Sequence, residues 1–281
     1  MAIAYQSIAT TDFNEVSPGT LTITKPSGLA VGDMMIANLV WDSNDNTAPT
    51  LPSGWTQVFH STTGTKSAMA YKVAVSGDVA ASNFVFTLAG TVTASGGSIM
   101  RWTGVGQIDA GSVYRDLSTT ATPTFTTGVT PSVADSYLLF IYYCEFTLNT
   151  VDSYAITTNN PTWVEVAQET NVSPDLTMAI AYASRPETTA TGNFTCTTEN
   201  SIGSHFGRLI VLSPITNINL SMPVGTLTLT SPTPSLTVDV NIPMPVGTLS
   251  VSGGIPTVTN DEHNVWTEET KNSTTWTEET K

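Results

Sequence analysis

The chain has few positive charges. Of its 281 residues, nine are Lys or Arg and 23 are Asp or Glu, which gives a formal net charge of −14. Charged residues make up only 11% of the chain, against about 25% in an average soluble protein. Proteins that bind nucleic acid contact phosphates through clustered Lys and Arg. The nine basic residues form no such cluster, so nucleic acid is not expected as a partner.

Cysteines and long apolar runs are also scarce. Cys144 and Cys196 are the only cysteines and fall in predicted strands, which favours two buried thiols. A disulfide would require an oxidising compartment, and a metal site would require more ligands nearby. The longest apolar runs, such as 137–144, are far shorter than the roughly 20 residues of a membrane helix. The start, 1–5, lacks the basic and apolar regions of a signal peptide, so neither membrane insertion nor a signal peptide is expected.

Helical periodicity is nearly absent. Short segments instead alternate apolar and polar residues, as at 21–24, 83–88 and 236–242, and Gly, Pro, Asn and Asp separate such segments at short intervals. Alternation with a period of two is typical of strands with one buried face, and many short strands between turns indicate a sandwich. We therefore predict an all-β protein whose main domain is a jelly-roll-like β-sandwich.

The first 213 residues contain a diverged internal repeat. Five motifs recur in the same order at offsets of 102, 108, 111, 110 and 107 residues. They begin at Gly32, Pro52, Ala68, Asn83 and Ile99 and recur at Ala134, Asn160, Ala179, Asn193 and Phe206. We predict two similar halves, about 1–106 and 107–213, that each bury one face and together form one sandwich with a pseudo-twofold relation. Trp55 and Trp163 fall at equivalent places, where closing the core is expected rather than binding a ligand.

A sharper repeat follows at 214–259. Residues 218–230 match 240–252 at an offset of 22, and both contain Met-Pro-Val-Gly-Thr-Leu. Each unit is predicted to form two short strands bent at this segment. Two units are too few for a self-supporting solenoid, so they should pack on the sandwich, on another copy of the chain or on a neighbouring protein. The predicted docking residues in these units are Met222, Met244, Leu227 and Leu249.

The tail, 260–281, contains the hexapeptide Trp-Thr-Glu-Glu-Thr-Lys twice, beginning at Trp266 and at Trp276. Ordering costs roughly 1–2 kcal/mol per residue, and so polar a segment buries too little area to offset it alone. In isolation we expect an extended, solvated tail. A Trp presented twice suits docking into the pockets of a partner, and backbone pairing as an added strand would contribute affinity. Trp266 and Trp276 are therefore predicted to dock on a partner.

Residues suited to catalysis are few. His60, His205 and His263 fall in three different contexts without metal-binding spacing, and the chain has no nucleophile elbow or phosphate-binding loop. Two carboxylates suffice for a glycosidase, but nothing distinguishes the candidates from surface acids. Those candidates are Asp42, Asp45, Glu145 and Glu165. We predict no enzymatic activity, no catalytic residue and no cofactor.

Two weaker binding signals have structural alternatives. Asp42, Asn44 and Asp45 gather oxygen ligands as a Ca²⁺ site could, but they depart from the EF-hand pattern, and an Asx-rich turn is the alternative. Exposed aromatic residues on sandwiches often stack against sugars, whereas core packing explains a lone Trp or Tyr more often. No sugar site is assigned to the aromatic candidates, which are Trp41, Trp102, Tyr114 and Tyr154.

Several motifs resemble proteins of tailed bacteriophages. Thr-Ile-Thr-Lys-Pro-Ser-Gly-Leu-Ala-Val-Gly-Asp at 22–33, Pro-Ser-Gly-Trp-Thr at 52–56, Tyr-Lys-Val-Ala at 71–74 and Phe-Val-Phe-Thr-Leu at 84–88 resemble a β-sandwich module. That module recurs in phage virion proteins and some bacterial surface proteins. The Met-Pro-Val-Gly-Thr-Leu and Trp-Thr repeats resemble the tails of minor structural proteins of tailed phages. The resemblance implies no catalytic residues, and it does not separate a capsid decoration or head fibre from a tail fibre.

Together these patterns predict a non-enzymatic virion protein on the exterior of the particle. The sandwich would project outward, and 214–281 would anchor it to other virion proteins of the capsid or tail and to sister subunits, with a homotrimer favoured. Its work would be to decorate the particle or to contact the host surface, including host glycans. A secreted bacterial adhesin or carbohydrate-binding module is the alternative function, and a polysaccharide depolymerase is a third hypothesis.

Overall fold

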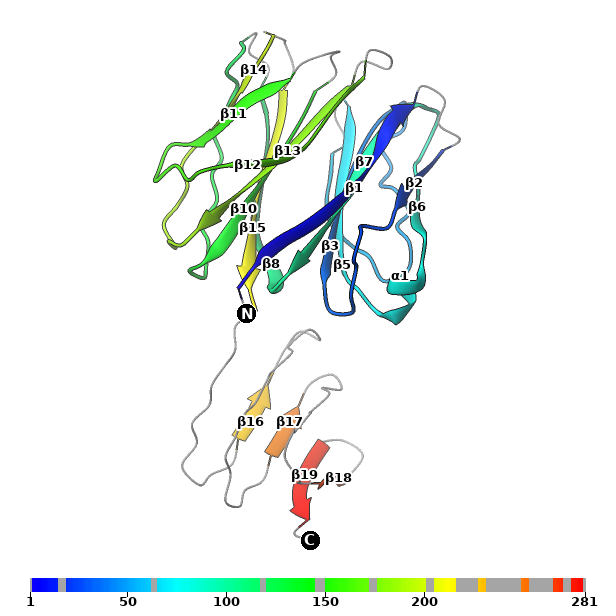
Figure 1. Ribbon diagram of the computed structural model, residues 1–281, viewed down its shortest axis with the longest axis vertical. Coiled ribbons are helices and arrows are strands. Elements are labelled where there is room, and N and C mark those ends of the chain that lie inside the picture. Colours follow the sequence, from blue (N-terminus) through cyan, green and yellow to red (C-terminus); the bar gives the residue numbers. More distant parts are fainter. Residues whose placement is uncertain are drawn as a thin grey trace. The chain divides into compact units, whose positions relative to one another are not determined.

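The computed structural model describes residues 2–14, 19–61, 65–116, 120–144, 150–171, 176–200 and 205–215. Beyond these it describes the strands at 227–230, 249–252, 265–269 and 274–279. The chain divides into two units, Met1–Ile215 and Thr216–Lys281 (Figure 1). Apart from one short helix, the described elements are all strands, which confirms the all-β prediction.

The first unit consists of two successive halves, β1 to β7 and β8 to β15. The first half contains β1 (Ala4–Asn14), β2 (Thr20–Thr24), β3 (Met34–Ser43), β4 (Thr56–Ser61), β5 (Lys66–Val73), α1 (Ser76–Ala80), β6 (Asn83–Thr87) and β7 (Val92–Thr103). The second half contains β8 (Val105–Asp116), β9 (Thr124–Phe125), β10 (Ser136–Cys144), β11 (Val151–Ile156), β12 (Val164–Asn171), β13 (Leu176–Arg185), β14 (Phe194–Thr198) and β15 (His205–Pro214).

The strands of each half are wound as in a jelly roll. The large sheets have the orders β1-β7-β3-β5-β4 and β8-β15-β10-β13-β12, which match position by position. In each half the first strand pairs with the last, and the second pairs with the next to last, β2 with β6 and β9 with β14. Jelly rolls pair their strands between two antiparallel sheets in this way. The prediction of an all-β, jelly-roll-like sandwich fold with two similar halves is therefore confirmed, with the difference that each half is a jelly roll of its own.

Each half buries both faces of its large sheet, so the expectation that each would bury only one face is wrong. On β3, Leu39 and Trp41 belong to the core of their own half, whereas Ile36 and Val40 belong to a core shared with the other half. β10 divides its residues in the same way. The layers run small sheet, large sheet, large sheet, small sheet (Figure 1). Strands buried on both faces have continuous apolar sequences, which is why β3 and β10 do not alternate.

Contacts across the shared core join equivalent strands of the two halves. Trp102 of β7 contacts Tyr182 of β13, and Arg208 of β15 contacts Ser67 of β5. β15 is the counterpart of β7, and β13 is the counterpart of β5. One contact therefore runs from the first half's β7 to β13, and the other runs from the second half's β15 to β5. Equivalent strands of both halves thus face the shared core, and the pseudo-twofold relation expected from the repeat stays a prediction.

The last of the five repeated motifs was matched in the wrong register. When β5 and β13 are matched through their repeated Ala-x-Ala-Tyr segments, Asn38 of β3 corresponds to Ile141 of β10. Asn38 pairs with Ser98, and Ile141 pairs with Arg208. Arg208 is thus the counterpart of Ser98 and not of Arg101. The two arginines have different environments, which is why their sequence similarity was misleading.

The Trp-containing repeat specifies a bulged edge strand. Trp55 precedes β4 and packs against Phe84 in the core of the first half, and Trp163 precedes β12 and packs against the core of the second. Three residues after each Trp, at Val58 and Val166, the ladder carries an extra residue. β-Bulges bend an edge strand and hinder its pairing with another sheet. Both tryptophans therefore have the structural role predicted for them.

The described part of the second unit is one four-stranded sheet in the order β16-β17-β19-β18. The strands are β16 (Leu227–Thr230), β17 (Leu249–Ser252), β18 (Val265–Glu269) and β19 (Thr274–Glu279). β16 and β17, one from each 22-residue repeat, pair in parallel, and β18 and β19, one from each hexapeptide, pair antiparallel. β17 pairs with β19 and joins the two sets. The tail that was expected to be extended on its own thus pairs with itself and with the preceding repeats. Met222 and Met244 lie outside the described residues.

Candidate functional site

The residues considered for catalysis have structural partners or lie outside the described chain. Within the described residues, no group of three or more His, Cys, Asp and Glu side chains is placed to hold a metal ion. Glu165 accepts a hydrogen bond from the Tyr154 hydroxyl at 2.7 Å. Burial, together with this bond, raises the pKa of Tyr154 above its usual value. Glu145 and His263 are not among the described residues.

The two cysteines are buried thiols, as predicted. Cys144 on β10 and Cys196 on β14 both belong to the core of the second half. No helix among the described residues is long and apolar enough to cross a membrane.

The loop 42–47 is an Asx turn. Asp45 Oδ1 accepts hydrogen bonds from the backbone N–H of Thr47 at 2.8 Å and from its hydroxyl at 2.7 Å, and these bonds lower the pKa of Asp45. An Asp that bonds the backbone two residues ahead defines such a turn. The other two oxygens hold the connection before β7: Asp42 Oδ2 accepts from the Thr93 hydroxyl at 2.6 Å, and Asn44 Oδ1 accepts from the Thr91 N–H at 3.0 Å. These bonds match the structural alternative to a Ca²⁺ site.

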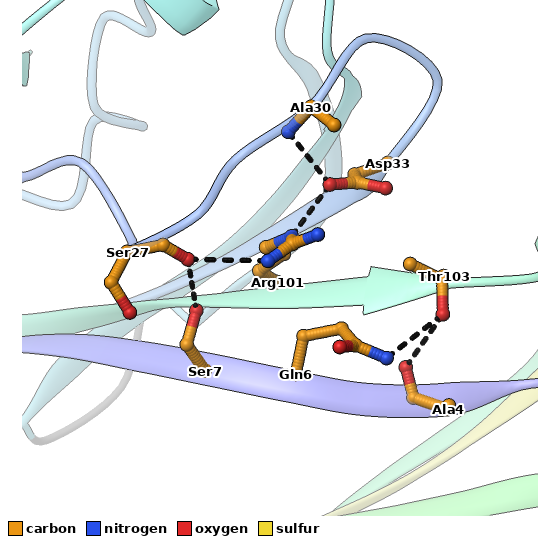
Figure 2. A network of polar contacts seen from close by, with 8 residues as sticks. All are labelled: Ala4, Gln6, Ser7, Ser27, Ala30, Asp33, Arg101 and Thr103. Atoms are coloured by element: carbon orange, nitrogen blue, oxygen red, sulfur yellow. Dashed lines mark hydrogen bonds and ion pairs between the residues drawn. The ribbon is translucent and has the colours of Figure 1, made fainter.

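The motif at 25–33, which contributes to the family resemblance, is held by an arginine from β7. Arg101 donates from Nε to the Asp33 carboxylate at 2.6 Å and from Nη1 to the Ser27 carbonyl at 3.3 Å (Figure 2). The same carboxylate accepts the backbone N–H of Ala30 at 2.8 Å. One ion pair thus fixes the beginning and the end of the loop.

The same network reaches β1 and requires a glycine. The Ser7 hydroxyl on β1 donates to the Ser27 carbonyl at 2.9 Å (Figure 2). Gly28 has a φ of +68°, and a Cβ at this position would lie 2.6 Å from Nη1 of Arg101. Only glycine combines that backbone conformation with room for the guanidinium. The Pro-x-Gly-x-x-x-Gly-Asp pattern is therefore explained by the stability of the fold.

The basic side chains described in the first unit have partners within the fold. Arg185 is fully buried and donates to the carbonyls of Thr158 and Asn159 and to Thr189. Ion pairs join Lys72 to Asp78 at 2.7 Å, Arg101 to Asp33 at 2.6 Å and Arg185 to Glu187 at 3.4 Å. Positive charge is thus used within the protein, and the acidic groups dominate the net charge available to a partner.

Arg208 differs because it lies in the shared core, and no carboxylate among the described residues pairs with it. Its guanidinium carbon lies 3.7 Å from the centre of the Phe59 ring, and Nη2 donates to the Ser67 hydroxyl at 3.3 Å. The Ser67 hydroxyl in turn donates to Tyr143 at 2.6 Å. Burial lowers the pKa of Arg208 to about 10, although Tyr143 opposes that shift. These contacts connect the two halves near the end of β10.

Four aromatic residues meet in the shared core near the start of β10. Tyr182 stacks on Tyr5 with ring centroids 5.3 Å apart and lies 6.0 Å from Tyr137. Trp102 contacts all three rings at 5.2 to 6.0 Å. Trp102 is fully buried, but the three tyrosines are half-buried, so the cluster reaches the surface. Burial and a neighbouring phenol raise the pKa of both Tyr5 and Tyr182.

Sequence reasoning missed this tyrosine cluster because its members come from β1, β10 and β13 of different halves. Of the aromatic residues weighed as sugar platforms, Trp41, Trp102 and Tyr154 are core residues. The side chain of Tyr114 is outside the described set. The three half-buried tyrosines come together only in the shared core, and no single sequence motif predicts that core.

The backbone register places four predicted docking residues on one face of the second unit's sheet. Leu227 pairs with Leu249, Leu249 pairs with Trp276, and Trp266 lies two residues along β18 from the partner of Trp276. Paired residues share a face, as do residues two apart on a strand. This face, termed the docking face, comprises Leu227, Leu229, Leu249, Val251, Trp266, Glu268, Thr274, Trp276 and Glu278.

The opposite face of this sheet is mainly polar. It comprises Thr228, Thr230, Ser250, Ser252, Val265, Thr267, Glu269, Thr275, Thr277 and Glu279. A sheet with one apolar face is stable when that face packs against another layer. The six apolar positions of the docking face therefore make it the strongest candidate surface for a protein partner.

Comparisons of the chain with protein-family models, with curated proteins and with solved structures found no match.

Proposed function

We propose that the chain is a non-enzymatic structural protein of a tailed-phage virion. It acts as an appendage on the exterior of the capsid or tail, anchored through its second unit. The observation that carries this proposal is the docking face, which is assembled from both C-terminal repeats and has Leu227, Leu249, Trp266 and Trp276 on one side of a single sheet. Such a face suits burial in an assembly.

The first unit suits display. Each half has a core of its own, and a third core joins them, so we expect the first unit to fold without the second. The chain's net charge of −14 favours solubility and opposes non-specific association. A stable, acidic sandwich fits decoration of the particle and also fits contact with a host surface.

We further propose that the chain assembles as a homotrimer through the second unit. The described four-stranded sheet has two edges, β16 and β18, and an apolar face. Sister subunits can cover the edges and part of that face. Light scattering of the full chain is expected to give three times the monomer mass of 29.7 kDa. A monomer at the same concentration would refute the trimer.

The anchoring role is tested by truncation. Particles produced without the protein are mixed with purified full chain or with a chain ending at Ile215, and the bound fraction is measured after sedimentation. We expect the full chain to bind and the truncated chain to remain in solution with an unchanged unfolding midpoint of the sandwich. Equal binding of both chains would show that the anchor lies in the first unit.

A carbohydrate-binding adhesin is the second candidate, and the tyrosine cluster supports it. Tyr5, Tyr137 and Tyr182 combine half-buried rings with hydroxyls, which is the chemistry that stacks against and bonds a neutral sugar. The test is binding of the full chain to immobilised host polysaccharide. Binding that is lost in Tyr137→Ala would favour this function, and no binding by the wild-type chain would remove it.

A further inference from the structure

The two hexapeptides pair in the register that makes them equivalent. Thr267 lies opposite Thr277, Trp266 lies opposite Glu278, and Glu268 lies opposite Trp276. The first residue of each copy therefore faces the third residue of the other, and the second faces the second. Because the two sequences are identical, this pairing has a local twofold axis between Thr267 and Thr277, perpendicular to the sheet.

This symmetry arranges Trp and Glu alternately at the four corners of one patch, termed the Trp/Glu pad: Trp266, Glu268, Trp276 and Glu278. All four are on the docking face. The two tryptophans occupy diagonal positions, which in an antiparallel ladder are about 7–8 Å apart. The pad thus offers the same pair of chemical groups twice, at a fixed short spacing.

We propose that the Trp/Glu pad binds a protein surface that has two equivalent apolar pockets, each bordered by Lys or Arg. The proposal rests on the anchoring function given above and names the chemistry of its partner. Tryptophan is the residue type most enriched among interface hot spots. A carboxylate next to each Trp would favour a basic border, which raises the association rate and selects the partner.

Charge distinguishes this partner from a second copy of the pad. β18 and β19 contain four glutamates, Glu268, Glu269, Glu278 and Glu279, and no Lys or Arg. Two pads placed face to face would bring like charges together, which is unfavourable. The pad therefore binds a different, basic protein. Sister subunits contact one another through the remaining part of the docking face and the sheet edges.

Equivalence of the two pockets makes a quantitative prediction about single substitutions. Trp266→Ala and Trp276→Ala should lower the amount of full chain bound to particles by similar factors, each at least about tenfold at limiting concentration. The double variant should not bind measurably, because both pockets of one pad act together. The paired Trp→Phe variant, which keeps an aromatic ring in each strand, should bind at an intermediate level.

The glutamates supply matched controls on the two faces of one hairpin. Glu268→Gln with Glu278→Gln should weaken binding and remove most of its dependence on salt. Glu269→Gln with Glu279→Gln makes the same change of charge on the opposite face, and binding should stay at the wild-type level. Particles lacking the protein are the binding surface throughout.

When the wild-type chain binds particles, three results would overturn the proposal. Strongly unequal losses in the two single Trp variants would show that the copies are not equivalent. Equal effects of the two glutamine pairs would show that net charge matters rather than the pad. Wild-type binding in the double Trp variant would leave the anchor in the second unit but place it elsewhere. If the wild-type chain itself fails to bind particles, the anchoring function is wrong, and the pad proposal fails with it.

Discussion

At the level of single residues, two arginines of the described chain, Arg185 and Arg208, are fully buried and are expected to contribute differently to stability. Arg185 donates to backbone carbonyls and pairs with Glu187, so its charge is compensated. Arg208 has an aromatic ring and hydroxyls as partners, and burial lowers its pKa to about 10. A lowered pKa in the folded state means that the charged form is less favourable there than in the unfolded chain.

Substitution of each arginine by Met is expected to give different results. Arg208→Met should leave the free energy of unfolding within about 1 kcal/mol of wild type or raise it, because a buried charge is replaced by an apolar chain of similar length. Arg185→Met should lower it by about 3–5 kcal/mol, since several backbone acceptors and Glu187 lose their partner. Urea unfolding at pH 7 measures both. A larger loss for Arg208→Met than for Arg185→Met would contradict this account.

His60 makes stability depend on pH. Burial, and to a smaller extent the charge of Lys66, lower the pKa of His60 below its usual 6.5. The His60 ring stacks on the Trp41 ring, with the two ring centroids 5.9 Å apart. The unfolded chain therefore takes up the proton first, so stability should fall as the pH decreases through 6.5. Thermal unfolding midpoints between pH 8 and pH 5 should drop less in His60→Gln than in wild type. Parallel curves for the two proteins would rule out this contribution.

At the level of elements, the loop at 25–33 shows how a motif is explained by its structure. Asp33 holds Arg101 and the backbone of Ala30, and both ionic side chains are largely buried. Asp33→Asn should lower the free energy of unfolding by about 2–4 kcal/mol, because the charge of Arg101 then lacks its partner. Asp152→Asn, an exposed change on β11, is the control and should alter it by less than about 0.5 kcal/mol. Equal effects would mean that the ion pair does not hold the loop.

Elements with a local signal could be predicted from sequence, and elements defined by distant contacts could not. Trp55 and Trp163 occur within similar motifs, so the sequence predicts that they are equivalent and that they pack against a core. The contact of Trp102 with Tyr182 joins residues about 80 positions apart, and no pattern in the sequence links them. Similarity between short motifs even gave a wrong match. It pairs Arg208 with Arg101, whereas strand pairing makes Arg208 the counterpart of Ser98.

The sequence predicts which residues dock on a partner, but it does not predict that they lie on one face of a sheet. Trp266 and Trp276 were chosen for their repetition, and Leu227 and Leu249 for their place in the 22-residue repeats. Only the register that joins β17 to β19 places all four on one face. The tail was expected to need a partner in order to pair, because each hexapeptide is too polar to form a strand alone. The hexapeptides pair without another protein because each copy supplies the other with a complementary strand.

At the level of the whole molecule, two jelly rolls form the first unit, and the described strands of the second unit form a single sheet. Three cores stabilise the first unit, whereas the described strands of the second unit form one layer. Single layers require a partner for their apolar face. This asymmetry is the physical basis for the proposal that the first unit is displayed and the second unit is the anchor.

The most direct test of this account is the position of the two ends of the chain on a phage particle. Gold particles coupled to a tag after Lys281 and, separately, to a tag before Met1 can be located by electron microscopy on intact particles that carry the protein. The account predicts that the C-terminal label lies at the particle surface and that the N-terminal label reaches farther out. A C-terminal label that projects outward beyond the N-terminal one, or absence of both labels from purified particles, would contradict it.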